Sequence, residues 1–378
     1  MKVLVVASWY PSQSVPSKGI FVREQVLAAH KAGAEVEVLA LRYESGGLLS
    51  TTINRFQDPE GFRVYELHFR SPAWKFIHEL PVVQKMLLSK AHQLVKDFKP
   101  DLIHSHVIHP AGIIADTLAK QAGIPHVLTD HWSLSTDYLA KSGMGRSSMK
   151  TLASYMPVSR FLAERNALYS PVRVDVIPNV IDEATFYPGD YRRGENDPVR
   201  LTSVANWNRT KRVVKQPELF IEGLEAACKE TGIPVVLTLI GDGNMIPELK
   251  ARAGSLSYPI VFAGAKPKAE VAARLRESDV FLHASTIETF SVVIAESLLS
   301  GTPVVASKVG AIPELVNNSL GILVENDQQS WTEGIKKMLI AVRESKWERD
   351  TISQAHRGRF TYESIGNSLI DLYSELIS

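Results

Sequence analysis

A strand–helix–strand alternation is clearest in residues 280–306, which read VFLHASTIETFSVVIAESLLSGTPVVA. The apolar run 280–283 predicts a buried strand, residues 292–300 have the spacing of a helix, and residues 304–306 predict a second strand. Two strands joined by a helix in this way form a parallel unit. The stretch therefore predicts an α/β fold.

The same alternation extends over most of the chain. Before residue 187, strands are predicted at residues 2–7, 36–41, 101–104, 125–129, 156–158 and 174–177. After residue 198, further strands are predicted at residues 201–205, 235–240, 260–262 and 321–324. Helical patterns occupy residues 19–32, 217–229, 268–277 and 362–377.

Residues 187–198 interrupt this alternation with Pro, Gly and charged residues, a composition typical of an exposed linker. We therefore predict two Rossmann-like, doubly wound domains of parallel strands, residues 1–186 and 199–360, that face a cleft. Residues 361–378 form an additional helix. In such sheets ligands bind at the carboxyl ends of the strands.

The amino-acid composition argues against several classes of protein. The 378 residues include 42 Lys and Arg against 41 Asp and Glu, a balance that gives no reason to expect nucleic acid as a partner. The single cysteine, Cys228, excludes an internal disulfide and fits a reducing compartment. The start of the chain lacks the pattern of a secretory signal, and no apolar run approaches the ~18 residues of a membrane-spanning helix. We expect a cytoplasmic protein.

Several common phosphate and metal motifs are missing from the sequence. It has no intact GxGxxG after the first strand, no Walker motif, no HExxH and no Asp-x-Asp pair. Phosphate binding is instead predicted where the helix of residues 292–300 opens, because backbone N–H groups at Phe290, Ser291 and Val292 can donate to a diphosphate there. We expect no metal.

Two glutamates accompany this helix opening. Glu288, just before it, can reach hydroxyls of a sugar attached to the diphosphate, and Glu296 can bind a ribose. Alternatively, Glu288 complements the helix dipole and Glu296 lies on a solvated face.

The motifs around these glutamates resemble those of the GT-B-fold retaining glycosyltransferases of family 4. The resemblance rests on ETFSVVIAE, SGTPVVAS and GAIPE after residue 287, and on PSQSVPSKGIFVREQ, PDLIHSH, IPNVID and IGDG before it. It covers nearly the whole chain in order. It implies that Glu288 contacts the donor sugar and diphosphate, that Glu296 binds the ribose, and that the last helix packs back on the first domain.

The resemblance also implies an Arg and a Lys after the first strand of the second domain, where they neutralise the donor diphosphate. Asn206 stands where the Arg is commonest. Counting forward from the strand favours Lys211, and counting back from the next helix favours Lys215. The candidates therefore stay open among Arg209, Lys211, Arg212 and Lys215.

Three glycines are candidates for close approach to the donor. Gly19 lies where the family often has a Gly-Gly pair, here Lys18-Gly19, and a side chain there would block a phosphate. Gly241 and Gly243 follow a strand end in IGDG. For all three, a glycine that only serves a turn is the alternative.

Histidines gather after strand ends in the first domain. The resemblance implies that His131, in VLTDHWS, faces the donor sugar and assists the reaction; the alternative is packing against Trp132. His104, His106 and His109 are close enough in sequence to suggest zinc, but no fourth ligand accompanies them. We expect His106 and His109 on the acceptor side.

These features together predict a retaining, metal-independent transfer of a hexosyl-type residue from a nucleoside-diphosphate sugar. The expected acceptor is a saccharide or a lipid-linked saccharide, in surface polysaccharide or glycoconjugate synthesis. A nucleotide-sugar epimerase of the same fold and a non-catalytic nucleotide-sugar-binding protein are the alternatives. The basic, amphipathic stretch from Trp74 to Lys99 suggests peripheral contact with the inner face of a membrane.

Overall fold

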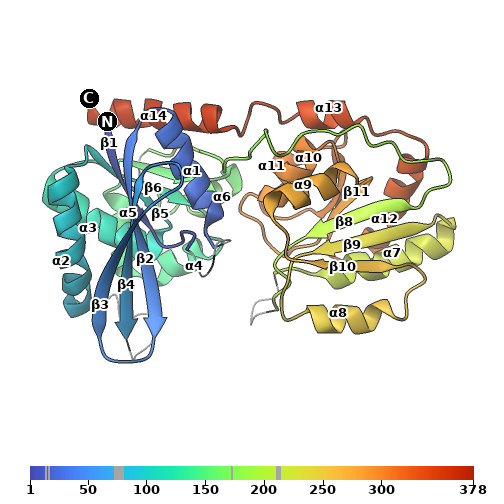
Figure 1. The fold of residues 1–378 in the computed structure, drawn as a ribbon, viewed down its shortest axis with the longest axis horizontal. Helices are drawn as coiled ribbons and strands as arrows, with labels where there is room; N and C mark the ends of the chain where they lie inside the picture. Colours follow the sequence, from blue (N-terminus) through green and yellow to red (C-terminus); the bar gives the residue numbers. More distant parts are fainter. Residues whose placement is uncertain (13–14, 16–17, 72–80, 172, 210–213) are drawn as a thin grey trace. The chain divides into compact units, whose positions relative to one another are not determined.

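The computed structural model describes residues 1–12, 15, 18–71, 81–171, 173–209 and 214–378 (Figure 1). The chain divides into two compact α/β units. Unit 1 comprises Met1–Val180 and Phe360–Ser378, and unit 2 comprises Ile181–Arg359.

The division differs from the predicted one at residues 181–198, which belong to unit 2. Phe186 is buried there beneath the Lys268 ammonium, and the Arg276 guanidinium donates a hydrogen bond to the Thr185 carbonyl. The guanidinium carbons of Arg200 and Arg349 lie 4.9 and 5.8 Å from the centroid of the Tyr191 ring. Aromatic side chains therefore fasten to unit 2 a segment whose Pro, Gly and charge content suggested a linker.

The seven-stranded sheet of unit 1 has the order β3-β4-β2-β1-β5-β6-β7. Neighbouring strands are parallel except for β3 and β4, which are antiparallel. The strands are β1 (Lys2–Ala7), β2 (Glu35–Ser45), β3 (Ser50–Gln57), β4 (Arg63–Ser71), β5 (Leu102–His106), β6 (His126–Asp130) and β7 (Ser154–Pro157).

The sequence prediction missed β3 and β4 and placed a strand at residues 174–177 that does not form. Strand β3 is almost wholly exposed and largely polar, so it has no apolar run to reveal it. Val174 and Val176 are about 40% exposed, and Val174 forms only an isolated bridge to Tyr155.

Helices cover both faces of the unit 1 sheet. The core on one face includes side chains of α1 (Ile20–Lys31) and α14 (Tyr362–Ile377), and the Tyr362 hydroxyl donates to the Glu24 carboxylate between these helices. The core on the other face includes side chains of α2 (Pro81–Phe98) and α3 (Ile113–Ala122). Shorter elements follow: η2 (Ile108–Gly112), α4 (Ser135–Lys141), α5 (Gly143–Lys150) and α6 (Arg160–Arg165).

The six-stranded sheet of unit 2 is wholly parallel and has the order β10-β9-β8-β11-β12-β13. Its strands are β8 (Val199–Val204), β9 (Val235–Ile240), β10 (Ile260–Gly264), β11 (Val280–His283), β12 (Val304–Ser307) and β13 (Gly321–Val324). Renumbered within the unit, this is the doubly wound order 3-2-1-4-5-6, whose switch point lies between β8 and β11.

In the described part of unit 2, the helices that connect the strands or follow them are α7 (Pro217–Thr231), α8 (Ile246–Ala253), α9 (Lys268–Arg276), α10 (Val292–Leu299), α11 (Ile312–Leu315), α12 (Gln328–Arg343) and α13 (Arg349–Gln354). Buried Trp207, Phe220 and Trp331 are among the large side chains of its core. In the described part of the chain, no helix combines the length and apolar character needed to cross a membrane.

Candidate active site

The switch point of unit 2 brings together two segments that are far apart in sequence. Residues 214–216 pair with the loop after β11: the Thr286 N–H donates to the Val214 carbonyl at 2.8 Å, and the Gln216 N–H donates to the Ala284 carbonyl at 3.1 Å. Lys215 and Ser285 form an antiparallel bridge between these bonds. This pairing fixes Lys215 beside the carboxyl end of β11.

Lys215, His283 and Glu288 form one polar cluster there. The Lys215 ammonium forms an ion pair with the Glu288 carboxylate. His283 Nε2 lies 2.9 Å from Glu288 Oε1 and 3.2 Å from Lys215 Nζ. Because the carboxylate can only accept, the tautomer that carries hydrogen on Nε2 fits this arrangement. The Glu288 carboxylate thus has one cationic donor, Lys215, and one neutral donor, His283.

Burial and charge act in opposite directions on the pKa of the Glu288 carboxyl group. Burial alone would raise the pKa of Glu288, but the Lys215 charge and the His283 hydrogen bond outweigh it and hold that pKa well below its ordinary value. Burial and the Lys215 charge together lower the pKa of His283. Near pH 7 the Glu288 side chain is therefore a carboxylate and the His283 imidazole is neutral.

The sequence analysis missed two residues of this neighbourhood. His283 is the last residue of the predicted strand 280–283, and its place at a carboxyl end was the available signal. Gly310 has φ +56°, and a Cβ there would overlap the backbone of Glu288, whose carbonyl accepts the Ala311 N–H at 2.9 Å. The GAIPE motif therefore holds the loop that carries Glu288.

The helix opening lies just beyond this loop. Helix α10 begins at Val292, and Ser291 before it has φ 71° and ψ 74°, a left-handed conformation that costs a non-glycine residue energy. The Ser291 hydroxyl is buried and has no hydrogen-bond partner among the described residues. The first N–H groups of a helix lack partners within it, so this end can bind an anion. Glu296, in the second turn, is half-buried.

The structure distinguishes between the basic residues that are candidates for binding the donor diphosphate. Lys215 contacts Glu288, whereas the Arg209 guanidinium forms an ion pair with Glu218 and lies 3.3 Å from a Glu248 oxygen. Lys211 and Arg212 lie outside the described residues. The geometry thus favours Lys215 over Arg209 as the cation next to the glutamate loop.

The candidate glycines all accommodate neighbouring backbone. A Cβ on Gly241 or Gly243 would overlap the backbone of Ala205 or Trp207, respectively, in the loop after β8. A Cβ on Gly19, which has φ +73°, would lie 2.5 Å from the Trp9 carbonyl carbon. The structural alternative accounts for each glycine, since the space that a side chain would need is filled by the chain itself.

In unit 1 the histidines meet at the carboxyl ends of β5 and β6. His106 Nδ1 lies 3.1 Å from His131 Nε2, and the two rings stack with centroids 5.4 Å apart. His131 also packs on Phe21, with ring centroids 4.8 Å apart. His104 hydrogen-bonds with Thr129 Oγ1 at 2.7 Å and with the Tyr373 hydroxyl at 2.6 Å.

Burial keeps these histidines neutral. It lowers the pKa of His104 and of His131 to about 3, and that of His106 well below its ordinary value. His106 Nε2 is buried and has no partner among the described residues. Over the same residues, no group of three or more His, Cys, Asp or Glu is placed to hold a metal ion.

Asp130, which the sequence analysis did not single out, shapes the loop that carries His131. Its carboxylate accepts the Trp132 N–H at 3.0 Å, the Tyr155 hydroxyl at 3.0 Å and the Asn166 amide at 3.2 Å. Burial raises its pKa to about 6. Its position next to His131 at a strand end was the sequence signal.

His109 lines a cavity of about 390 Å³ in unit 1. Most of the other lining side chains are apolar or aromatic, and Lys18 and Arg42 add positive charge. The Arg42 guanidinium is engaged by the Tyr10 and Pro11 carbonyls, at 2.6 and 2.9 Å. The aromatic and aliphatic lining comprises Trp9, Leu41, Tyr43, Leu67, Phe69, Leu87, Ile114 and Trp132.

The sequence and the fold are similar to those of known glycosyltransferases. The family profile described as "Glycosyl transferases group 1" matches residues 200–340, and the profile "Glycosyltransferase Family 4" matches residues 19–185. The putative teichuronic acid biosynthesis glycosyltransferase TuaC of Bacillus subtilis is 25% identical over 361 residues, which cover 89% of each chain.

Two further proteins extend the comparison. One component of the human phosphatidylinositol N-acetylglucosaminyltransferase is 26% identical over 300 residues, which cover 75% of this chain and 58% of that one. The Anabaena protein HepE, solved in complex with UDP and glucose, has a similar fold, with a TM-score of 0.72 and 18% identity over all of both chains.

Proposed function

The chain belongs to the GT-B-fold glycosyltransferases of group 1, or family 4, and from this premise we propose that it transfers a hexosyl-type residue from a nucleoside-diphosphate sugar with retention of anomeric configuration. The observation that carries the proposal is the Lys215–His283–Glu288 cluster at the switch point of unit 2, next to the opening of α10. The proposed site is thus a sugar-binding carboxylate with a cation beside it.

In the proposed reaction, the oxygen of an acceptor hydroxyl forms a bond to the anomeric carbon, and the hydroxyl proton passes to the departing diphosphate oxygen. The bond from that carbon to the diphosphate oxygen breaks, and its electron pair stays with the diphosphate. The N–H groups at the start of α10 and the Lys215 ammonium stabilise this developing charge, which is where such groups contribute most to catalysis. Glu288 accepts hydrogen bonds from sugar hydroxyls, and Glu296 from the ribose. No metal is required.

Lys215 has two partners to serve in this scheme. Without donor, its charge compensates the buried Glu288 carboxylate. When the donor is bound, its diphosphate is a second anion for the Lys215 ammonium. The sugar hydroxyls can then donate hydrogen bonds to Glu288 in place of part of its contact with Lys215. Donor binding and the charge state of the cluster are therefore coupled.

For the acceptor we propose a molecule with an apolar portion, bound by unit 1. The cavity beside His109 supports this, because its lining is chiefly apolar and aromatic while Lys18 supplies a cation suited to a phosphate. The names of the relatives point to teichuronic acid biosynthesis in TuaC and to phosphatidylinositol in the human protein. A lipid-linked saccharide in polysaccharide or glycoconjugate synthesis fits these observations, because it combines a saccharide with an apolar lipid portion.

Peripheral membrane contact fits such an acceptor. Of the stretch from Trp74 to Lys99, residues 74–80 lie outside the described part, while α2 presents exposed Lys85, Lys90 and Lys96. Lysines on one helix can attract an anionic membrane surface.

Turnover assays test the proposal. Purified protein is incubated with UDP-, GDP- and ADP-hexoses and with either a water-soluble oligosaccharide or a polyprenyl-diphosphate-linked saccharide. We expect transfer to the lipid-linked acceptor in EDTA, with the new linkage of the same anomeric form as the donor. Inverted product, or strict dependence on Mg²⁺ or Mn²⁺, would contradict the mechanism. Isomerised donor without transfer would indicate the epimerase alternative.

A further inference from the structure

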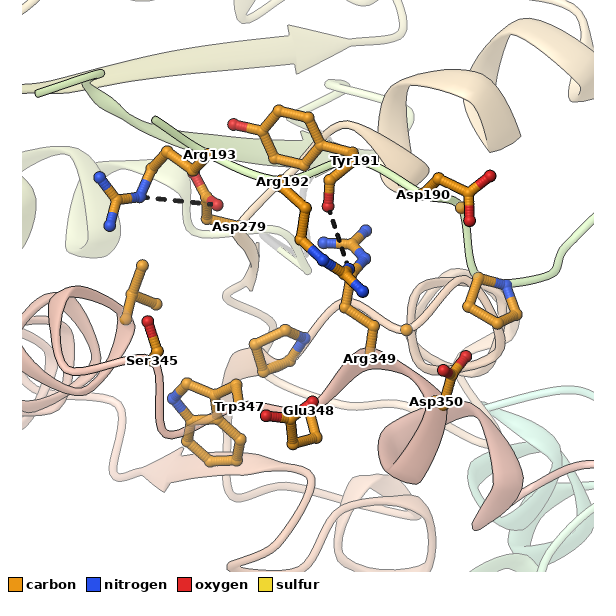
Figure 2. A pocket seen from close by; sticks show the side chains of 15 residues that line it. Asp190, Tyr191, Arg192, Arg193, Asp279, Ser345, Trp347, Glu348, Arg349 and Asp350 are labelled. Carbon is orange, nitrogen blue, oxygen red and sulfur yellow. Dashed lines mark hydrogen bonds and ion pairs between the residues drawn. The ribbon is translucent and has the colours of Figure 1, made fainter. Parts of the chain in front are cut away.

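Unit 2 contains a cavity at the amino ends of its strands, opposite to the carboxyl ends where Glu288 lies. Its wall includes Asp279, the residue before β11, and Pro303, the residue before β12, so it opens at the amino ends of the strands. Residues 188–193 and 345–350 supply most of the remaining lining (Figure 2). Its volume is about 350 Å³, comparable to that of small-molecule sites. It is therefore separate from the proposed donor site.

Three polar side-chain atoms in this lining are buried and have no hydrogen-bond partner among the described residues. They are the Tyr191 hydroxyl, Trp347 Nε1 and Arg349 Nε. The other Arg349 nitrogens are engaged, since they donate to the Ser278 carbonyl at 2.9 Å and to the Arg276 carbonyl at 2.5 Å. Buried donors without partners are costly and rare in native proteins, so a bound molecule that offers acceptors would relieve them.

The charges of the lining decide what kind of molecule fits. The lining contains four carboxylates and three guanidinium groups, so it has no excess of positive charge to favour an anion such as a phosphate or a nucleotide. The carboxylates of Asp190, Glu348 and Asp350 are on exposed residues and can accept hydrogen bonds. A ligand must therefore accept from the buried donors and donate to the carboxylates. Hydroxyl groups do both.

Aromatic side chains complete the pattern. In Figure 2 the Tyr191 ring lies at the top of the view and the Trp347 ring toward the bottom, with the Arg192 and Arg349 guanidinium groups between them. Trp347 combines an apolar ring face with a polar edge atom. Tyr191, whose ring packs against Arg200 and Arg349, contributes its hydroxyl. Sugar rings offer the complement, with apolar C–H faces and hydroxyls around the edge. We propose that this cavity binds a neutral saccharide.

The ligand extends beyond one sugar unit. Trp347 also lines a shallower hollow beside β13, together with Lys308, Leu323 and Lys337. A chain of two or more sugar units can therefore run from the cavity along the edge strand. The proposal that the ligand is a glycan rests on the proposed function, because an enzyme that acts on glycans encounters them during turnover. Holding a glycan here raises its effective concentration near the enzyme between transfers.

The experiment uses the full chain with maltotetraose, cellotetraose and a β-1,4-galactotetraose as neutral probes. Binding is followed by the indole N–H resonance of Trp347, assigned by its loss in Trp347→Phe, and by saturation-transfer difference NMR. We expect at least one tetrasaccharide to shift this resonance. Tyr191→Phe and Trp347→Phe each remove one polar atom but retain an aromatic ring, and each should weaken saturation transfer at least fivefold.

Tyr187→Phe is the matched control, because Tyr187 is in the same segment, is 48% exposed and stacks on Arg276 outside the cavity lining. It should leave glycan binding unchanged. The proposal is overturned if no probe binds, if all three variants bind equally, or if inorganic phosphate or UDP shifts the Trp347 resonance and the tetrasaccharides do not. Turnover is measured separately, so that loss of the transferase proposal and loss of this one are distinguishable.

Discussion

The Lys215 ammonium forms an ion pair with the Glu288 carboxylate, although 73 positions separate them in sequence. The pair exists because residues 214–216 hydrogen-bond to the loop after β11. His283 adds a third contact to the same carboxylate. The Glu288 side chain is only 14% exposed, so its charge depends on Lys215 for compensation. A reaction that uses the Glu288 carboxylate therefore depends on Lys215 as well.

Removing only one member of this pair should destabilise the protein. Lys215→Gln leaves the Glu288 carboxylate buried without its cation, which typically costs about 3–5 kcal/mol. The double variant Lys215→Gln/Glu288→Gln removes both charges and should recover most of that stability, while turnover stays lost in both. Urea unfolding and a transfer assay on the two proteins check this. A double variant that recovers activity would contradict a direct role for the pair.

The two glutamates should differ in what their loss affects. Glu296→Ala should weaken binding of the bare nucleoside diphosphate by roughly 1–3 kcal/mol, because a charged hydrogen bond to the ribose is lost. Glu288→Ala should depress turnover more than this binding, because its proposed partner is the transferred sugar. Isothermal titration and kcat measurements compare them. Equal effects on nucleotide affinity would remove the division of roles.

Nucleotide binding should not require a metal. UDP or GDP at ~100 times its dissociation constant should stabilise the protein by about 2.7 kcal/mol, with EDTA present, because Lys215 and the opening of α10 receive the diphosphate. The melting temperature with and without Mn²⁺ measures this. Stabilisation that disappears in EDTA would show that a divalent cation takes part.

Unit 1 should lose stability in mild acid. Burial lowers the pKa of His126 to about 4, and those of His104 and His131 to about 3, against about 6.5 when unfolded. Their stabilising contribution is complete above pH 6.5 and is lost as the pH falls toward these values, since the unfolded chain binds protons first. Asp130, whose pKa is raised to about 6, acts in the opposite sense, with a contribution lost as the pH rises from 4 to 6.

The histidines outnumber the aspartate, so the net change is destabilisation between pH 6.5 and 4. Each unmatched proton contributes about 1.4 kcal/mol per pH unit. Hydrogen exchange of the β5 and β6 amides at pH 7 and 5 reports on unit 1 alone. Exchange that is equally protected at both values, after correction for its intrinsic pH dependence, would show that the histidines are not held neutral by burial.

Local sequence patterns predicted the elements that are apolar and repeated. The bounds of β1, β9, β11, β13 and α14 agree with the predicted ranges to the residue. The two parallel-sheet domains and the family resemblance were likewise confirmed by the sheet topology and the comparisons. Strand β3 was missed because an exposed edge strand needs no apolar face.

The candidate site was harder to predict, because its contacts join distant segments. The sequence offered several basic residues after β8, and only the pairing of residues 214–216 with the loop after β11 singles out Lys215 against Glu288. The role of Gly310 depends on an overlap with Glu288, 22 positions earlier. Spacing along one segment cannot reveal which backbone will pass close to another.

The last prediction separates a catalytic from a packing role for His131. The structure buries this residue against His106 and Phe21, so its loss must cost stability even if it also assists turnover. His126 provides the matched control, because it is also buried and begins β6, whereas His131 directly follows the other end of that strand. His126 Nε2 lies 2.8 Å from Ser105 Oγ.

Both His131→Ala and His126→Ala should lower the melting temperature. Only His131→Ala should also lower kcat, by at least tenfold or about 1.4 kcal/mol of barrier, with nucleotide affinity unchanged, because a group that acts in the transition state affects turnover more than binding. Activity is measured well below both melting temperatures and normalised to folded protein. If the two variants lose stability alike and both keep full specific activity, His131 serves packing alone.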